Sequence, residues 1–295
     1  LLVANGHHVK IETKAGVGAN FSDQEYSEAG AEICQGPTEI YECNIVFKVT
    51  PPSDEEVDLM PGQQTLISAL QISIQPKEVL TKLIRKKITA IAWDYIRDED
   101  GVFSLVRTVG EIAGNTSILI AGELISSFAS GKGMMLGGIA GVQPTEVVII
   151  GAGTVGEFAT RAALGLGASV KVFDNRLSKL RRLQNDIGKR VYTSIIQPKV
   201  LAKAIKRADI VIGALRSNVG KTPCVVTEMM IQDMKSGSVI VDVSIDQGGC
   251  FETSRITNHD DPTFIKHGVT HYCVPNIASR VSRTASFAIS NIFSP

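Results

Sequence analysis

The 295-residue sequence lacks the features that mark membrane proteins and nucleic-acid-binding proteins. No run of apolar residues reaches the length of about 18 that a membrane-spanning helix needs, because Glu123 interrupts the longest one. An excess of one charge sign is also missing: Lys and Arg number 30, and Asp and Glu number 30. No net field therefore attracts nucleic acid or an anionic lipid surface, and we expect neither partner.

Cysteine is scarce and scattered along the chain. The five cysteines form no C-x-x-C pair, and no Cys/His cluster has the spacing of a zinc site, so we expect no bound metal. No signal-peptide pattern opens the chain, and the cysteine usage favours a reducing cytoplasm. The cysteines are Cys34, Cys43, Cys224, Cys250 and Cys273.

The sequence does have the composition of a packed protein with room for two domains, at 44% apolar and 20% charged residues. From residue 146 onward, short β-branched runs alternate with segments of helical period. Six strands separated by helices predict an α/β domain with a parallel sheet covered on both faces. The predicted strands are 146–150, 169–173, 190–194, 208–214, 238–244 and 270–274.

The first hundred residues repeat this pattern less regularly and predict a second α/β domain. Ser22 and Glu25 have the spacing of a capping box, and Pro76 is suited to begin another helix. The predicted strands are 8–12, 44–49, 64–70 and 88–96. Residues 110–128 predict one long helix, which together with the glycine-rich residues 131–142 we interpret as the crossing between the domains.

The stretch VVIIGAGTVGEF (147–158) places three glycines at the spacing G-x-G-x-x-G between a predicted strand and a predicted helix. This is the context of a dinucleotide-binding turn, in which the backbone approaches a pyrophosphate and the helix N-terminus offers free N–H groups to it. The alternative is that the glycines serve only the tight turn. The predicted cofactor contacts here are Gly151, Gly153, Thr154, Val155 and Gly156.

Asp174 closes the second strand of this half and follows Gly156 by 18 residues. A carboxylate near this interval accepts hydrogen bonds from the adenosine ribose hydroxyls. The same charge repels a 2′-phosphate, so NAD is favoured over NADP, although the nearby Arg176 leaves NADP open as an alternative.

Doubly wound sheets bind their ligands beyond the carboxyl ends of the strands. The fourth strand of the second half ends at Ala214 and Leu215, and the strands after it lead to Asp246 and Asn276. We therefore expect all four residues beside the cofactor, with Asp246 near the nicotinamide as a candidate general base. The alternative for Asp246 is a cap of the loop before two glycines.

Several longer segments extend well beyond the glycine turn. They are residues 6–33, FKVTPP (47–52), GEIAGNTS (110–117), LGGIAGV (136–142), MKSGSVIVDVSIDQGGCFETS (234–254), HYCVPN (271–276) and VSRT (281–284). In combination with the glycine turn and Asp174, they resemble the alanine dehydrogenase family. This family shares its ancestry with the NAD-binding component of proton-pumping nicotinamide nucleotide transhydrogenase.

The resemblance implies reversible, NAD-dependent oxidative deamination of L-alanine to pyruvate and ammonium, through hydride transfer to the nicotinamide and hydrolysis of an imine. It also implies two Rossmann-like, doubly wound parallel-sheet domains with a cleft between them. The substrate (catalytic) domain would comprise residues 1–104 plus 283–295, and the NAD-binding Rossmann domain residues 105–282. Family members are usually homo-oligomers, commonly hexamers.

The resemblance further assigns roles to individual residues. Lys48 matches the lysine of the family's K-V-x-x-P motif, which would hold the substrate's carboxylate or carbonyl oxygen. The alternative is a surface lysine on an edge strand. Asp246 matches the active-site aspartate, and Asn276 matches the asparagine that closes over the substrate and the nicotinamide.

Three positions depart from the family pattern. Gln71 stands where the family has its catalytic histidine, and an amide cannot carry a titrating proton at neutral pH. Asp246 is then the simplest substitute base, with Gln71 orienting the substrate. Gly110 replaces a serine on the cofactor side, and the family's substrate arginine would lie upstream of Leu1.

Two functions from different classes remain after the sequence is read. The first is an amino-acid dehydrogenase acting on alanine, which Lys48, Asp246 and Asn276 favour. The second is a dinucleotide-binding module without amino-acid chemistry of its own, either a redox sensor or a transhydrogenase-type component, which Gln71 favours.

Overall fold

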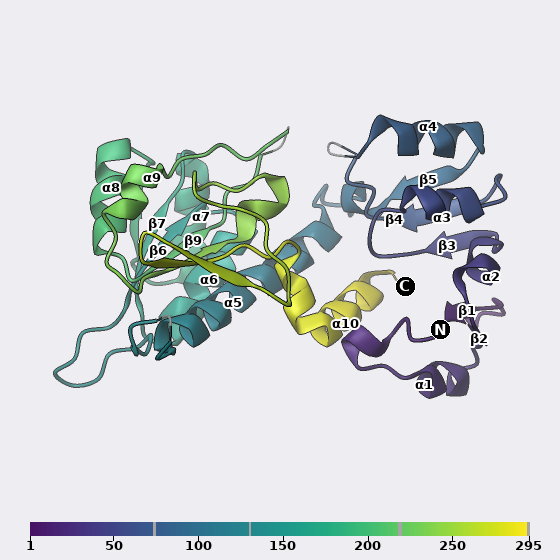
Figure 1. Ribbon diagram of the computed structural model, residues 1–295, viewed down its shortest axis with the longest axis horizontal. Coiled ribbons are helices and arrows are strands. Elements are labelled where there is room, and N and C mark those ends of the chain that lie inside the picture. Colours follow the sequence, from purple (N-terminus) through teal and green to yellow (C-terminus); the bar gives the residue numbers. More distant parts are fainter. Residues whose placement is uncertain (73–74, 130, 218–219, 294–295) are drawn as a thin grey trace. The chain divides into compact units, whose positions relative to one another are not determined.

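The computed structural model describes residues 1–72, 75–129, 131–217 and 220–293, and Figure 1 shows how the elements follow one another. The helices are α1 Asp23–Glu28, α2 Pro37–Tyr41, α3 Asp54–Leu59, α4 Lys77–Arg85, α5 Ser104–Ser126, α6 Thr154–Gly165, α7 Leu177–Ile187, α8 Pro198–Arg207, α9 Glu228–Gln232 and α10 Ser282–Phe293. The strands are β1 Lys10–Glu12, β2 Glu32–Cys34, β3 Ile45–Phe47, β4 Thr65–Ser68, β5 Thr89–Ala92, β6 Glu146–Ile150, β7 Ser169–Phe173, β8 Tyr192–Ser194, β9 Ile210–Gly213, β10 Val239–Asp242, β11 Thr263–Lys266 and β12 Val269–Tyr272.

The chain divides into two compact units. Unit 1 comprises Leu1–Thr108 and Val281–Pro295, and unit 2 comprises Val109–Arg280. Among the described helices, none combines the length and the apolar character needed to cross a lipid bilayer.

Unit 2 contains a seven-stranded sheet in the order β11-β12-β10-β9-β6-β7-β8. All neighbours run parallel except β11, which pairs antiparallel with β12 at the edge. The strand order reverses direction beside β6, as in doubly wound dinucleotide-binding sheets. The six predicted strands of this half are confirmed, and β11 is an additional strand that the pattern of alternating strands and helices did not predict.

Both faces of this sheet are buried, because neighbouring residues of β6 point into different cores. Val147 and Ile149 join a core with residues of α5, α6 and α7, whereas Val148 and Ile150 join a core with residues of α8 and α9. The sheet therefore lies between helices on either side (Figure 1). This layering leaves the two ends of the strands as the places where polar side chains gather.

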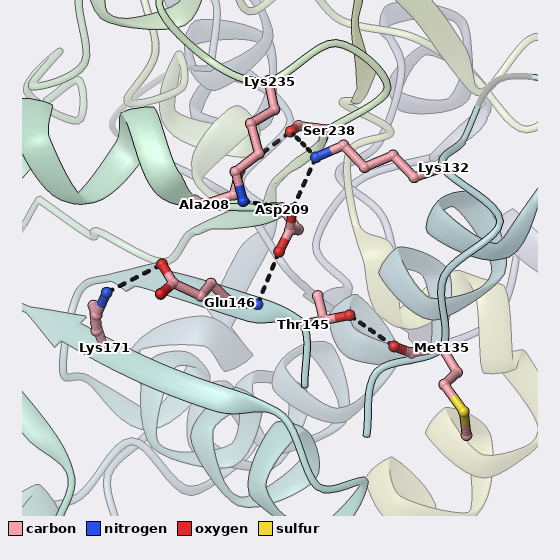
Figure 2. Close-up of polar contacts among 9 residues, drawn as sticks. All are labelled: Lys132, Met135, Thr145, Glu146, Lys171, Ala208, Asp209, Lys235 and Ser238. Carbon is pink, nitrogen blue, oxygen red and sulfur yellow. Dashed lines mark hydrogen bonds and ion pairs between the residues drawn. The ribbon is translucent and has the colours of Figure 1, made fainter. Parts of the chain in front are cut away.

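The amino ends of the central strands are held by a buried carboxylate, that of Asp209 (Figure 2). One oxygen accepts hydrogen bonds from the ammonium groups of Lys132, at 2.8 Å, and Lys235, at 3.0 Å. The other accepts the backbone N–H of Glu146 at 3.0 Å, and Lys132 also donates to the Ser238 hydroxyl at 2.9 Å. A buried charge left without partners would be costly, and here both carboxylate oxygens accept hydrogen bonds. This network fastens the loop around Lys132 to the sheet.

Unit 1 contains two small parallel sheets, β1-β2 and β3-β4-β5. The predicted α/β pattern with parallel pairing is confirmed, but the five strands fall into two sheets, and the three-residue strand β2 was not predicted. The predicted capping box is present, since Ser22 and Glu25 cap the first turn of α1 reciprocally. Helix α4 begins directly after Pro76, as predicted.

Helix α5 carries the chain from unit 1 into unit 2. The interpretation of residues 131–142 as part of the crossing is wrong, because this segment belongs to unit 2 and turns back on α5. The backbone amides of Lys132 and Met134 both donate to the carbonyl of Ile125, at 2.9 and 3.2 Å. Just after this segment, the Thr145 amide donates to the carbonyl of Leu136 at 3.0 Å.

Candidate active site

The three fingerprint glycines each meet a different requirement. Gly151 has φ +117, and a Cβ there would lie 2.3 Å from the carbonyl oxygen of Ala214. At Gly156, the first turn of α6 approaches β6 so closely that a Cβ would lie 1.8 Å from the Gly151 carbonyl oxygen. By contrast, a Cβ at Gly153 would meet nothing within 4 Å. The protein itself therefore requires glycine at 151 and 156, and position 153 opens onto free space.

Helix α6 begins directly behind this free space. No side chain caps its N-terminus at Gly153, and Thr154 and Val155 form the first turn. The N–H groups of a first helical turn have no partners within the helix and carry partial positive charge. This arrangement fits a pyrophosphate held by the backbone, with the bare Gly153 allowing close approach.

Asp174 comes to the same turn from the neighbouring strand, directly after the end of β7. Its buried carboxylate accepts the N–H of Ala152 at 2.8 Å and the N–H of Arg176 at 2.7 Å. The carboxylate thus orders the glycine turn as well as standing where the ribose contact is predicted. Each carboxylate oxygen has two acceptor sites, so these two bonds leave capacity for a ligand hydroxyl.

The next strands bring Asp246 and Asn276 together at the same carboxyl edge of the sheet. The N–H of Asn276 donates to Oδ1 of Asp246 at 2.8 Å. Asn276 holds a left-handed conformation, φ +50, which asparagine tolerates better than most residues. Asp246 is exposed, but the protein atoms around its carboxyl displace part of the water there and raise its pKa above the ordinary value, while the Asn276 N–H and the charge of Arg216 offset part of this rise. A carboxylate with a raised pKa is suited to accept a proton.

The backbone of unit 2 also brings Ala214 and Leu215 to this edge. The N–H of Ala214 donates to the Ile150 carbonyl at 2.8 Å, and the Gly151 backbone packs against its carbonyl group. The predicted cofactor residues of unit 2 therefore follow adjacent strands at one edge. Whether each contacts the cofactor stays a prediction.

In unit 1, Lys48 follows the end of β3 and is already paired. Its ammonium group lies 2.7 and 2.5 Å from the two carboxylate oxygens of Glu56, with the Pro51 carbonyl at 3.4 Å. Burial by itself raises the pKa of Glu56, but hydrogen bonds from Lys48, the Ser53 amide and Tyr41 outweigh it and hold that pKa below its ordinary value. The pair holds the half-buried ammonium group of Lys48 in a fixed orientation.

Gln71 follows the end of the neighbouring strand β4. Its side chain is exposed and its backbone is left-handed, with φ +46. Because β3 and β4 are parallel, with Phe47 opposite Ile67, the chain carries Lys48 and Gln71 away from the same edge of this sheet. The proposed role of Gln71 in orienting a substrate stays a prediction.

Glu56 is a site residue that the sequence reading missed. The signal was present, since Ser53 and Glu56 have the S-x-x-E spacing of a capping box, and both halves of that box are formed at the start of α3. Its second function, pairing with Lys48, depends on the loop that folds α3 back beside β3. That contact follows from tertiary structure and has no local sequence pattern.

His271 offers no replacement for the family's catalytic histidine. Its ring is fully buried in β12, with Nε2 2.8 Å from the Thr253 hydroxyl and Nδ1 3.0 Å from the Val269 carbonyl. Burial lowers the pKa of His271 to about 4, so the ring is neutral at physiological pH. His271 is therefore a core histidine with both ring nitrogens hydrogen-bonded.

One group among the described residues could offer three ligand atoms to a metal ion. Atoms of Glu32, Cys34 and Glu39 in unit 1 lie within 4.8 Å of one another. Two of the three residues are exposed carboxylates, and His8 already pairs with Glu32 at 2.8 Å. Glu32 and Cys34 lie in β2 and Glu39 in α2, and we assign no role to this group.

The whole chain matches known protein families. The model "Alanine dehydrogenase/PNT, N-terminal domain" matches residues 1–113, and the model "Alanine dehydrogenase/PNT, C-terminal domain" matches residues 117–295. The chain belongs to the alanine dehydrogenase/PNT family. The predicted family resemblance is therefore confirmed.

Individual relatives agree with this assignment. Alanine dehydrogenase 2 of Staphylococcus aureus (strain USA300) is 40% identical over 295 residues, which is 100% of this chain and 79% of the relative. A solved structure of an L-alanine dehydrogenase aligns with a TM-score of 0.90 at 38% identity, covering 98% of this chain and 80% of that one. A transhydrogenase structure from Sinorhizobium meliloti, 24% identical, aligns with a TM-score of 0.84 over 97% of this chain and 83% of its own, and shares the fold.

Proposed function

We propose that this protein is an NAD-dependent alanine dehydrogenase. It would convert L-alanine, NAD⁺ and water into pyruvate, ammonium, NADH and a proton, and the reaction would be reversible. The observation that carries the proposal is the 40% identity to an alanine dehydrogenase over all 295 residues, in both units of the chain. We assign substrate binding to unit 1 and NAD binding to unit 2.

The residues of unit 2 fit a nicotinamide dinucleotide. The open face of Gly153 and the uncapped start of α6 suit a pyrophosphate, and Asp174 stands at the end of the adjacent strand where a ribose is recognised. The negative charge of Asp174 favours NAD over NADP. When bound, NAD would accept the hydride released from the substrate carbon.

The protein's own groups would bind the substrate and move its protons. Lys48 supplies a charged donor for the substrate carboxylate or carbonyl oxygen. Asp246 would take a proton from the water that attacks the substrate carbon, and the raised pKa of its carboxyl supports this role. Gln71 would orient the substrate through its amide, and Asn276 would close over it beside Asp246.

A second candidate function is favoured by Gln71 alone. Without a titrating side chain at that position, the protein could bind NAD and act as a redox sensor, or as a transhydrogenase-type component that passes hydride to an NADP-binding partner. Such a protein would bind NAD without reducing it in the presence of any L-amino acid.

The experiment that separates these functions follows NADH absorbance with L-alanine and a panel of other L-amino acids. The dehydrogenase reduces NAD with L-alanine, and Lys48→Met lowers kcat/KM by about 10- to 100-fold, because a hydrogen bond to a charged group is worth about 1.5–3 kcal/mol. Lys82→Met is the matched control. Lys82 lies in the same unit and pairs with Asp54 at 2.5 Å and Asp58 at 3.0 Å, so its replacement also removes a lysine paired with carboxylates of α3 but leaves the Lys48–Glu56 pair in place.

Two outcomes of this experiment oppose the proposal. NAD binding without reduction across the panel supports the second function. An equal loss of activity in Lys82→Met and Lys48→Met indicates that charge or stability is being measured, with no particular role for Lys48.

We also propose that the protein forms homo-oligomers and works in the cytoplasm. The first proposal rests on the resemblance to a family of homo-oligomers. The second is supported by the five free cysteines, of which Cys34, Cys250 and Cys273 are buried as thiols. Light scattering of the purified protein tests the first, and fractionation of cells tests the second.

A further inference from the structure

Asp242 is a buried carboxylate directly below the loop that carries Asp246. It is the last residue of β10, lies opposite Gly213 of β9, and has only 1% of its surface exposed. The proposed reaction gives it no chemical role, because its side chain points into the protein and not toward the open edge of the sheet.

The hydrogen bonds that the side chain of Asp242 accepts all come from the loop that follows it. Oδ1 accepts the N–H of Ser244 at 3.0 Å, and Oδ2 accepts the N–H of Cys250 at 3.2 Å. Oδ2 also accepts the hydroxyl of Ser254 at 2.6 Å. One carboxylate therefore fixes three points along residues 244–254, and Asp246 lies between the first two.

Two glycines leave the room that this carboxylate occupies. A Cβ at Gly213 would lie 2.7 Å from Oδ1 of Asp242, and a Cβ at Gly249 would lie 2.6 Å from Oδ2. Gly249 also has φ +79, so the loop turns back toward the carboxylate in a conformation that favours glycine. The backbone of both neighbours is thus fitted around the side chain of Asp242.

Such a carboxylate is a poor means of stabilising a fold. Moving a charge out of water is costly, and apolar residues of similar volume often replace buried charged groups without loss of stability. What charged hydrogen bonds do add is geometry, because they are short and directional. The loop ordered in this way holds Asp246 against the Asn276 N–H, and holds the Gln247 carbonyl 2.8 Å from the Thr222 N–H.

We propose that Asp242 is a positioning residue, whose carboxylate holds the loop of residues 243–254 in the shape that presents Asp246 to the substrate. The inference rests on the proposed function insofar as Asp246 acts on the substrate. The hydrogen bonds between Asp242 and this loop lie within unit 2 alone.

The test compares Asp242→Asn with Asp209→Asn in the complete protein. An asparagine at 242 has one acceptor oxygen, so its NH₂ group must face the N–H of either Ser244 or Cys250, and the loop is released at that point. Asp209 is a matched control, since it is also buried in unit 2 and also accepts three hydrogen bonds, but at the amino ends of the strands (Figure 2). Ser254→Ala removes one donor to Asp242 and provides a milder second variant.

Two readouts, kcat and hydrogen exchange, are expected to change together, and a third, NAD binding, is expected to stay nearly constant. In Asp242→Asn, kcat for L-alanine falls about tenfold or more, while the dissociation constant for NAD changes less than about twofold, because the glycine turn is left intact. Backbone hydrogen exchange rises in peptides covering residues 243–254. Asp209→Asn lowers the melting temperature but leaves kcat and the exchange of residues 243–254 unchanged. Ser254→Ala shows the same changes as Asp242→Asn to a smaller degree.

Unchanged exchange and kcat in folded Asp242→Asn overturn the proposal, as does an equal loss of kcat in Asp209→Asn. If Asp242→Asn does not fold, unchanged exchange and kcat in Ser254→Ala overturn it. If the unsubstituted protein does not oxidise L-alanine, the proposed function has failed. The exchange of residues 243–254 then still decides whether Asp242 clamps the loop.

Discussion

At the scale of single residues, Gln71 stands where the family resemblance predicts a catalytic histidine. Its left-handed backbone conformation is one that histidine also adopts more readily than most residues. The backbone at position 71 therefore does not exclude a histidine. The amide side chain of Gln71 is not required by the backbone conformation.

Replacing Gln71 by histidine tests whether a titrating side chain at this position increases the activity. We expect Gln71→His to raise kcat/KM for L-alanine at neutral pH by about 10² where proton transfer limits the rate, since a positioned acid or base contributes about 10²–10⁴. Initial rates of NADH formation measure this. Gln63→His is the matched control, because Gln63 is also exposed and left-handed, with φ +56, in the same unit. Equal rates for the two variants would show that residue 71 does not take part in proton transfer.

The pKa of Asp246 predicts how the rate depends on pH. The surrounding protein atoms raise this pKa, so the ionised base is lost as the pH falls through a value above the ordinary aspartate value of 3.8. The acid limb of the kcat/KM profile should therefore lie at higher pH than an aspartate with the ordinary pKa would give, and activity is full above it. In Asp246→Asn that limb should disappear along with most of the activity. A limb that persists in Asp246→Asn would assign the titrating base to another group.

The sequence predicted which residues lie near the candidate site better than it predicted their hydrogen-bond partners. Lys48 and Asp174 directly follow strands, and Asp246 lies in the segment after β10, where the alternation of strands and helices puts them. The pairing of Lys48 with Glu56 and the clamp of Asp242 on Ser254 depend on how loops fold back. No local pattern encodes those contacts.

At the scale of elements, the turn between β6 and α6 separates what glycine does for the fold from what it does for a ligand. Gly151 and Gly156 are required by close backbone approaches within the protein, whereas Gly153 faces open space. Gly165, at the end of α6, also meets nothing within 4 Å, and it lies away from the turn.

Alanine substitutions should therefore give three different results. Gly156→Ala lowers the melting temperature strongly, because its Cβ would overlap the Gly151 carbonyl group. Gly153→Ala keeps the melting temperature measured without ligand but weakens NAD binding by about tenfold or more, since its methyl group occupies the pyrophosphate approach. Gly165→Ala leaves NAD binding unchanged and stabilises by up to about 1 kcal/mol, because alanine favours the helix. Thermal unfolding without NAD and titration calorimetry with NAD measure the two effects.

The result for Gly153→Ala decides between the two interpretations of the turn. Unaltered NAD affinity in that variant would mean that the glycines serve only the turn, and the proposed cofactor site would be misplaced.

Elements with strong local signals were predicted well. β6 and β7 coincide with their apolar, β-branched runs, and α4 begins directly after Pro76. β2 and β11 were missed for different reasons. β2 has only three residues, too few to show an alternating pattern. β11 lies between two parallel strands, where a parallel sheet leads one to expect a helix or a loop. The antiparallel pairing of β11 with β12 depends on the folded sheet and has no local sequence signal.

At the scale of the whole molecule, the repeated alternation of strands and helices was enough to predict an α/β protein with parallel sheets. The order of the strands was not predictable from local pattern, because it depends on pairings between residues far apart in the chain, such as Val147 with Ile210. The same limit applies to the division of the unit 1 strands into two sheets. Family similarity over both units then supplies the function that fold alone leaves open.

The most direct measurement of the central claim is the fate of the hydrogen on the substrate carbon. The complete protein is mixed with NAD and L-alanine deuterated at C2, and the products are analysed by mass spectrometry. We predict that the deuterium appears in the reduced nicotinamide in amounts equal to the pyruvate formed, with a lower yield in Lys48→Met and Asp246→Asn. NAD that binds to the protein but gains no deuterium, with no pyruvate released, would contradict the account.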